Sequence, residues 1–179
     1  MIVLGIDPGS RLTGFGVVRR RGSQLVALAA GRIAVAGERD LPARLAVLAR
    51  EIEGLVERYA PDAVVLESLF HGVNSRSLIV LAQARGAILA AVGRRGLAAT
   101  EYSPAEIKRA VTGNGRADKR QVAQMVGLLL GLDRRERATD ATDALAAAIC
   151  FAQRYRLDAL RDTAETVPEA AAATPRDHA

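Results

Sequence analysis

The sequence is poor in the residues that build disulfide scaffolds, zinc sites and histidine-dependent active sites. It contains one cysteine, Cys150, and two histidines, His71 and His178, among 179 residues, and it has no tryptophan. A lone cysteine cannot close an internal disulfide, and its Ala-rich surroundings are typical of a small buried side chain in a reducing compartment. The sequence also lacks a Cys/His metal set, a Ser/His pair with a nucleophile elbow, and a Walker-type loop. These shortages argue against a disulfide-stapled domain, a zinc site and a serine hydrolase.

Long hydrophobic runs are also missing, although hydrophobic residues make up 50% of the chain. The apolar stretches are short and are broken by Gly, Arg or Glu, whereas a membrane span needs roughly 20 apolar residues. The N-terminal residues MIVLGIDPGS lack the basic region, the long apolar core and the cleavage site of a secretory signal. We therefore expect a cytoplasmic protein without a membrane segment, and the length suits one domain with a substantial core.

Charge is distributed unevenly along the chain. The formal net charge is +5, but residues 158–179 carry five acidic side chains against two arginines, so the rest of the chain is more basic than the whole. A basic body suits a polyanionic partner, because contacts to phosphates release condensed counterions. Composition alone is explained equally well by an ordinary solvated surface that is rich in arginine.

Five strands and five helices are predicted from hydrophobic periodicity and turn residues. The predicted strands are residues 2–6, 13–18, 25–33, 63–66 and 98–102. The predicted helices are residues 41–59, residues 77–92, a segment that begins at Pro104 after the N-cap Ser103, a segment that ends near Gly131, and a last one that Asp140 opens. The first strand is interrupted only at Gly5 and ends at the turn Asp7-Pro8-Gly9-Ser10.

The order of these elements predicts one α/β domain. Three strands in succession suggest an antiparallel meander, and the short, wholly apolar strand at 63–66 is typical of the parallel part of a sheet. Strands and helices then alternate, which gives a mixed five-stranded sheet flanked by helices on both faces. We assign residues 1–157 to this domain and expect residues 158–179, which are rich in Ala, Thr, Glu and Pro, to be a disordered tail.

Four acidic residues stand where such a fold brings chemistry together. Asp7 and Glu67 each close an apolar strand, and open α/β sheets bind ligands at the carboxyl ends of strands. Asp140 and Asp143 are spaced so that both project from one face of an apolar helix. If that helix packs across the same sheet edge, four carboxylates converge, and such oxygen ligands suit Mg²⁺ or Mn²⁺ rather than Zn²⁺. Two such ions about 4 Å apart can activate a water and stabilise the leaving oxygen of a phosphodiester.

Each acid also has a simpler structural explanation. Asp7 precedes a proline and could only initiate a turn, and Asp140 and Asp143 lie in a first helical turn, where acids favour the helix dipole anyway. Glu67 is harder to explain in this way, because a charge that closes the most hydrophobic strand must end in solvent, in an ion pair or on a metal.

Four segments of the chain resemble the characteristic blocks of the RuvC-type Holliday-junction resolvases. They are GIDPGSRLTGFGVV from Gly5, LESLF at 66–70, LAQARGAILAAV at 81–92 and TDATDALAAAIC at 139–150, in register from residue 1 to about 157. The resemblance implies a ribonuclease-H-like fold and a homodimer whose two active sites make paired symmetric nicks in a four-way DNA junction, in homologous recombination and DNA repair. It also implies a branch-migration helicase complex as a candidate partner, and we expect helix 77–92 to contribute to the dimer interface.

The resemblance also assigns roles to individual residues. The positions of the family's four catalytic, metal-binding acids are held here by Asp7, Glu67, Asp140 and Asp143. Some members have His in place of Asp140, so the all-carboxylate set here favours a hard cation, and we expect Asp7 to bridge two Mg²⁺ or Mn²⁺ ions. Lys108 and Lys119 match basic positions near the scissile phosphates, where a lysine can stabilise transition-state charge. We expect Lys108 to be catalytic and to bind DNA and Lys119 to bind DNA, although a solvated helix face also explains both.

Further DNA contacts are predicted in two polar loops. Phe70, one of three phenylalanines, lies in the segment LFHGVNSRS and is a candidate for stacking on an unpaired base at the crossover, with packing beneath the loop as the alternative. Asn74 and Arg76, from the same segment, are candidates for contact with the backbone or bases. Arg116, in the Gly-rich stretch 112–116, is a candidate for a phosphate contact.

Alternative functions are weighed by the same residues. An actin-like or sugar-kinase-like ATPase would duplicate the fold over a much longer chain. A non-catalytic DNA-binding module could use the two helices between Ser103 and Gly131, which superficially resemble a helix-turn-helix, but it has no use for carboxylates that face phosphates. A ribonuclease-H-like nuclease with another substrate, such as an RNA-containing duplex, is opposed only by the resolvase-like segments outside the acids.

Overall fold

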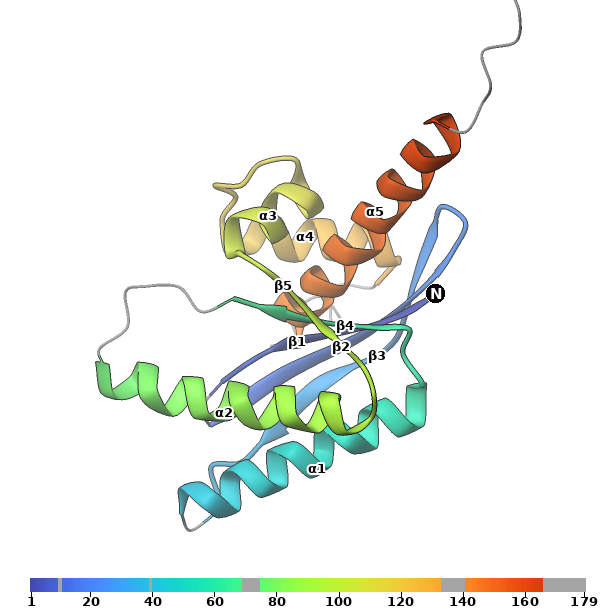
Figure 1. The fold of residues 1–179 in the computed structure, drawn as a ribbon. Helices are drawn as coiled ribbons and strands as arrows, with labels where there is room; N and C mark the ends of the chain where they lie inside the picture. The colour runs from blue at the N-terminus through green and yellow to red at the C-terminus, as the bar shows by residue number, and fades with distance from the viewer. Residues whose placement is uncertain (10, 39, 69–74, 133–140, 166–179) are drawn as a thin grey trace, which may run out of the picture.

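The computed structural model describes residues 1–9, 11–38, 40–68, 75–132 and 141–165 (Figure 1). Their strands form one sheet in the order β3-β2-β1-β4-β5. The strands are β1 (Ile2–Asp7), β2 (Leu12–Arg21), β3 (Gln24–Ala34), β4 (Ala63–Glu67) and β5 (Ala99–Tyr102). The helices are α1 (Leu41–Tyr59), α2 (Ser75–Arg94), α3 (Pro104–Thr112), α4 (Lys119–Leu130) and α5 (Thr142–Glu165). Strands β1 to β3 pair antiparallel and β1, β4 and β5 pair parallel, which confirms the predicted mixed sheet.

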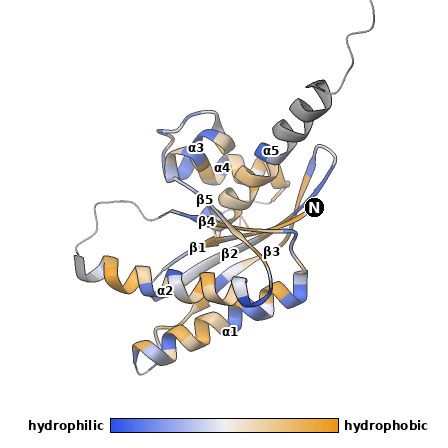
Figure 2. Cartoon of the chain, viewed as in Figure 1, coloured by the Kyte–Doolittle hydropathy of each residue, from blue (hydrophilic) through white to orange (hydrophobic). Residues whose placement is uncertain are grey.

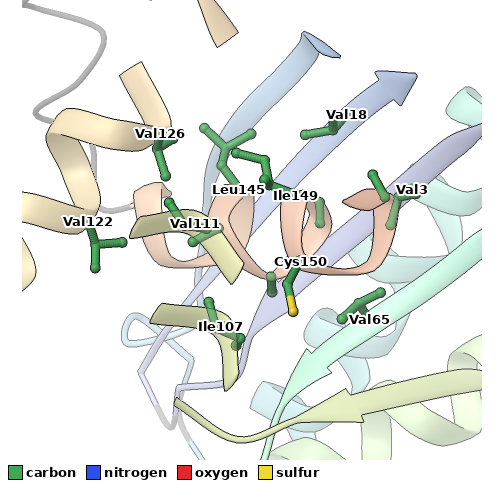
Figure 3. Packing of buried hydrophobic residues seen from close by; sticks show 14 of the residues in the cluster. Val3, Val18, Val65, Ile107, Val111, Val122, Val126, Leu145, Ile149 and Cys150 are labelled. Carbon is green, nitrogen blue, oxygen red and sulfur yellow. The ribbon is translucent and has the colours of Figure 1, made fainter. Parts of the chain in front are cut away.

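Helices cover both faces of the sheet, as predicted. Successive side chains of a strand point to opposite faces, so β1 contributes Leu4 and Ile6 to the core beneath α1 and α2, and Val3 to the core beneath α3, α4 and α5. Figure 3 shows the second core, in which Leu145 and Ile149 of α5 lie among side chains from α3, α4 and the sheet. Because β1 and β4 lie at the centre of the sheet, the ends of these two strands are fixed by packing on both sides.

A pair of glycines allows α5 to lie directly on the sheet. Gly5 of β1 and Gly16 of β2 are partners in the antiparallel register. A Cβ atom on Gly5 would overlap the carbonyl oxygen of Ala144 and lie 2.9 Å from the backbone nitrogen of Ala148, and one on Gly16 would lie 2.8 Å from Leu145. The interruption of the first apolar run at Gly5 therefore has a packing cause, because only hydrogen leaves room for the backbone of α5.

Capping residues account for several helix boundaries. Asp40 is the N-cap of α1 and accepts a hydrogen bond from the backbone N–H of Ala43 at 2.9 Å. Helix α1 carries polar and apolar residues on different sides (Figure 2), and it has the predicted bounds. Ser103 and Glu106 form the predicted capping box at the start of α3, and Gly113, in the left-handed region (φ 79°), is the C-cap of this helix.

The bounds of two helices differ from those predicted. Helix α2 spans Ser75–Arg94 and extends beyond the predicted range 77–92 at both ends. Helix α5 begins at Thr142 and continues to Glu165, past residue 157, where the change of composition placed the end of the domain. Residues 158–165 contain no glycine or proline, so nothing in them breaks the helix where the composition changes. Asp140, predicted to open α5, lies outside the described residues, as do residues 166–179.

Helix α2 is the most apolar helix of those described. Its residues Ser77–Arg94 have a mean hydropathy of 1.3, and their length and composition would suit a membrane span, although only 22% of this stretch is buried. Single apolar helices of soluble proteins meet the same criterion. Here α2 packs against α1 and contributes Ile88 and Val92 to the core, which explains part of its apolar character.

Candidate active site

Asp7 and Glu67 end neighbouring parallel strands at the same edge of the sheet. The register of β1 and β4 pairs Ile6 with Leu66, so the acids that follow these residues lie next to each other. Alternation of side chains places both acids on the sheet face that packs against α5, the face to which Val3 and Val65 belong. The carboxylates thus meet at the carboxyl ends of two strands, where the sequence predicted them.

Three helices bring further charged side chains to the same place. Asp143 lies in the first turn of α5, Lys108 is on α3, and Lys119 is the first residue of α4. The Nζ atom of Lys119 lies 3.1 Å from Oδ2 of Asp143, although 80% of the Lys119 side chain is exposed. The resulting cleft has a volume of about 270 Å³ and is lined by Asp7, Glu67, Pro104, Ile107, Lys108, Lys119, Val122, Asp143 and Ala146.

The pKa values of Asp7 and Glu67 in this cleft are raised above their ordinary values. Burial, reinforced by the charge of Asp143, raises the pKa of Asp7 from 3.8 to about 6, against the opposing effect of Lys119. Burial also raises the pKa of Glu67 from 4.5 to about 7, with Asp7 and Asp143 adding to the shift and the two lysines opposing it. The two lysines therefore neutralise only part of the negative charge, and a further cation would stabilise the ionised carboxylates.

The donor set fits a hard divalent cation. The acidic side chains among the described lining residues offer carboxylate oxygens, which Mg²⁺ and Mn²⁺ prefer, and none of these described residues carries sulfur or imidazole. Within the described part of the chain, no group of three His, Cys, Asp or Glu side chains is placed closely enough to hold a metal ion. Asp140, the remaining predicted ligand, lies outside the described residues. The excess negative charge at Asp7 and Glu67 is the feature that such an ion would relieve.

Of the four loop residues predicted to contact DNA, only Arg116 has both its backbone and its side chain among the described residues. Arg116 is exposed between α3 and α4, and its backbone N–H donates a hydrogen bond to Oδ1 of Asn114 at 2.9 Å. Phe70 and Asn74 lie outside the described residues. Arg76 lies in the first turn of α2, where only the backbone is described.

A charged network that sequence reasoning missed joins α5 to α3 and β5. Arg154 of α5 forms an ion pair with Glu106 of α3, at 2.9 Å between Nη1 and Oε1, and its guanidinium lies 4.9 Å from the centroid of the Tyr102 ring. Hydrogen bonds from Ser103 and Arg154 lower the pKa of Glu106 to about 2. The capping box was visible in the sequence, but nothing there indicated Arg154, which is 48 positions away from Glu106. This network ties the helix that carries Lys108 to the helix that carries Asp143.

The order of the sheet and the acidic cleft at the ends of β1 and β4 define a ribonuclease-H-like α/β protein. The family model described as "Crossover junction endodeoxyribonuclease RuvC" matches residues 3–151. The chain therefore belongs to the RuvC family of crossover junction endodeoxyribonucleases, as the sequence blocks predicted.

Individual relatives agree with this assignment over most of their length. The chain is 42% identical over 166 residues to the crossover junction endodeoxyribonuclease RuvC of Syntrophomonas wolfei, covering 93% of this chain and 96% of the relative. It is 48% identical over 152 residues to the RuvC of Ralstonia nicotianae, covering 85% and 83% of the two chains. Its fold matches that of Thermus thermophilus RuvC in complex with a Holliday junction substrate, with a TM-score of 0.83 and 31% identity, over 88% of this chain and 96% of the other.

Proposed function

We propose that this protein is a structure-specific endonuclease that resolves Holliday junctions by paired symmetric nicks in homologous recombination and DNA repair. Two findings support the substrate: the names of the curated relatives, and the solved T. thermophilus relative in complex with a Holliday junction substrate. The observation that carries the chemistry is the convergence of Asp7, Glu67 and Asp143 with two lysines in one cleft.

The carboxylates of the cleft are the proposed metal ligands. Nucleases of this family depend on divalent metal ions. In this proposal Asp7, Glu67 and Asp143, together with Asp140, hold Mg²⁺ or Mn²⁺, with two ions per site. Such ions make a water nucleophilic and neutralise the charge that develops on the leaving oxygen. Since protonated carboxyl groups are poor ligands, the raised pKa values of Asp7 and Glu67 predict cleavage that falls as pH drops below 7.

The lysines are the proposed contacts to the scissile phosphodiester. Lys108 projects into the cleft from α3, so its ammonium group can stabilise charge on the phosphoryl oxygens. Lys119 holds Asp143 in place through its ion pair and remains largely exposed to an incoming strand. Phe70, Asn74, Arg76 and Arg116 are proposed to contact DNA beyond the scissile phosphate.

A homodimer is the proposed assembly. Symmetric cutting of a two-fold junction calls for two active sites related by a two-fold axis. Helix α2 offers an apolar surface for such an interface, because only 22% of its apolar stretch is buried and the side chain of Ile79 is 59% exposed. A branch-migration helicase complex is proposed as a further partner. The cytoplasm is proposed as the compartment in which the protein acts.

The first experiment measures nicking of a synthetic four-way junction with Mg²⁺, Mn²⁺ or EDTA, beside linear-duplex and RNA–DNA hybrid controls. We expect symmetric, metal-dependent nicks in the junction alone, and their loss in Asp7→Asn. Glu57→Gln is the matched control, because Glu57 is an exposed acid on α1, which covers the opposite face of the sheet. Junction binding without cutting in either metal would favour the DNA-binding module, and preferential cutting of the hybrid would favour a different nuclease.

A further inference from the structure

Thr13 is a buried polar residue beside the turn that follows Asp7. It is the second residue of β2, and none of its surface is exposed. Its Oγ1 accepts a hydrogen bond from the backbone N–H of Gly9 at 3.3 Å and donates one to the carbonyl oxygen of Gly9 at 3.1 Å. One hydroxyl group thus satisfies both backbone groups of a residue in the turn that leaves β1.

The turn has little freedom to adopt another path while this contact is present. A Cβ atom on Gly9 would overlap the carbonyl oxygen of Leu12 and lie 2.9 Å from its carbonyl carbon, so the turn folds closely onto the start of β2. The register of β1 and β2 pairs Asp7 with Gly14, the neighbour of Thr13. Asp7 is therefore held on one side by the strand ladder and on the other by a turn that the Thr13 hydroxyl fixes.

We propose that Thr13 is a positioning residue, which holds both backbone groups of Gly9 and thereby fixes the direction of the Asp7 carboxylate in the cleft. This inference rests on the proposed role of Asp7 as a metal-binding acid. Thr13 shares its strand face with Val17, which packs in the core beneath α1 and α2, on the opposite side from α5. The Thr13 hydroxyl consequently acts on the reaction only through the turn.

Two substitutions in the full-length chain separate the hydroxyl group from the shape of the side chain. Thr13→Val keeps the branched shape, which suits a strand, but removes both hydrogen bonds to Gly9. Thr13→Ser keeps the hydroxyl and loses only a methyl group. We expect Thr13→Val to lower the turnover rate at a saturating concentration of junction at least tenfold. We also expect it to weaken Mn²⁺ binding, measured without DNA, at least fivefold. Thr13→Ser should stay within threefold of the wild type in both, and junction Kd should be unchanged in both variants.

Mn²⁺ binding without DNA is measured by calorimetric titration, and this measurement separates the inference about Thr13 from the proposed function. If the wild type cuts no junction, the proposed function fails, while the two variants still report whether Thr13 positions the ligands. Wild-type turnover and Mn²⁺ affinity in Thr13→Val would overturn the positioning role, even if that variant unfolds at a lower temperature. Equal losses in Thr13→Ser and Thr13→Val would also overturn it, because the methyl group would then be the cause.

A measurement on the wild type covers the case in which Thr13→Val does not fold. Amide hydrogen exchange at Gly9 should be at least a hundredfold slower than in an unstructured peptide, because its N–H is hydrogen-bonded to a buried side chain. Exchange at the rate of an exposed loop would show that Thr13 does not hold the turn, and it would overturn the proposal without any variant.

Discussion

Replacing Gly5 by alanine should lift α5 from the sheet and weaken both the fold and the active site. The added methyl group would overlap the carbonyl oxygen of Ala144 and lie 2.9 Å from the nitrogen of Ala148, both in the backbone of α5. Backbone atoms of a helix cannot rotate away as the end of a side chain can, so the whole helix must move by about 1 Å to restore ordinary contact distances. Overpacking of this kind costs about 1–3 kcal/mol, and we expect the upper part of that range.

The same movement carries Asp143 away from Asp7 and Glu67. Because Asp143 lies one residue before Ala144, it shares the displacement of the helix. A misplacement of about 1 Å in a catalytic group, which is the role proposed for Asp143, can cost about a hundredfold in rate. Gly5→Ala should therefore lower the cleavage rate far more than the loss of folded protein accounts for.

Urea unfolding and single-turnover nicking of a junction measure these two effects. Gly54→Ala is the matched control, because Gly54 lies in α1 with no atom within 4 Å of the position of a new Cβ. Alanine there should stabilise the protein by up to about 1 kcal/mol through helix propensity and leave cleavage unchanged. If Gly5→Ala loses less than about 1 kcal/mol and cuts at the wild-type rate, the close approach of α5 to β1 is wrong.

Three further predictions follow from the site and the surface. Asp7 has a pKa of about 6 in the fold against 3.8 ordinarily, so its ionisation destabilises the fold as pH rises from about 4 to about 6. Asp7→Asn should thus be about 2–3 kcal/mol more stable than the wild type at pH 7.5 without metal, and the difference should vanish in urea titrations at pH 3.5. Ile79→Glu should convert the proposed dimer to monomers in sedimentation, whereas Leu128→Glu, at an equally exposed position on α4, should not. Burial raises the pKa of Cys150 to about 11, so a thiol reagent should label it at least a hundredfold more slowly in the folded chain than in urea, and rapid labelling would contradict its burial in α5.

The fold could be predicted because its local signals agree with one another. The wholly apolar run before Glu67, the amphipathic pattern of α1 and the capping box at Ser103 each identify an element without knowledge of the rest. The convergence of Asp7 and Glu67 followed from strand order, since parallel neighbours end at one edge. Strong local patterns and a regular sheet therefore carry most of the architecture.

The contacts between distant elements were not predictable in the same way. The sequence showed Gly5 only as an interruption of a strand, and its role under α5 depends on where a helix more than a hundred residues later packs. The ion pair of Arg154 with Glu106 likewise joins two helices whose relative position no periodicity encodes. The ion pair of Lys119 with Asp143 also joins two helices and was not predicted, whereas the proposed contact of Lys119 with DNA stays a prediction.

The position of α5 at the end of the described chain bears on how the cell can make this nuclease safely. Asp7 and Glu67 leave the ribosome early, whereas Asp143 arrives only with α5, and translation proceeds at about 5–20 residues per second. Until α5 docks against Gly5, a nascent chain lacks the carboxylate of Asp143 and has an uncovered sheet face. If Asp143 is a metal ligand as proposed, a partly synthesised chain lacks part of the site, and hydrolysis of DNA becomes available only when synthesis of the domain is complete.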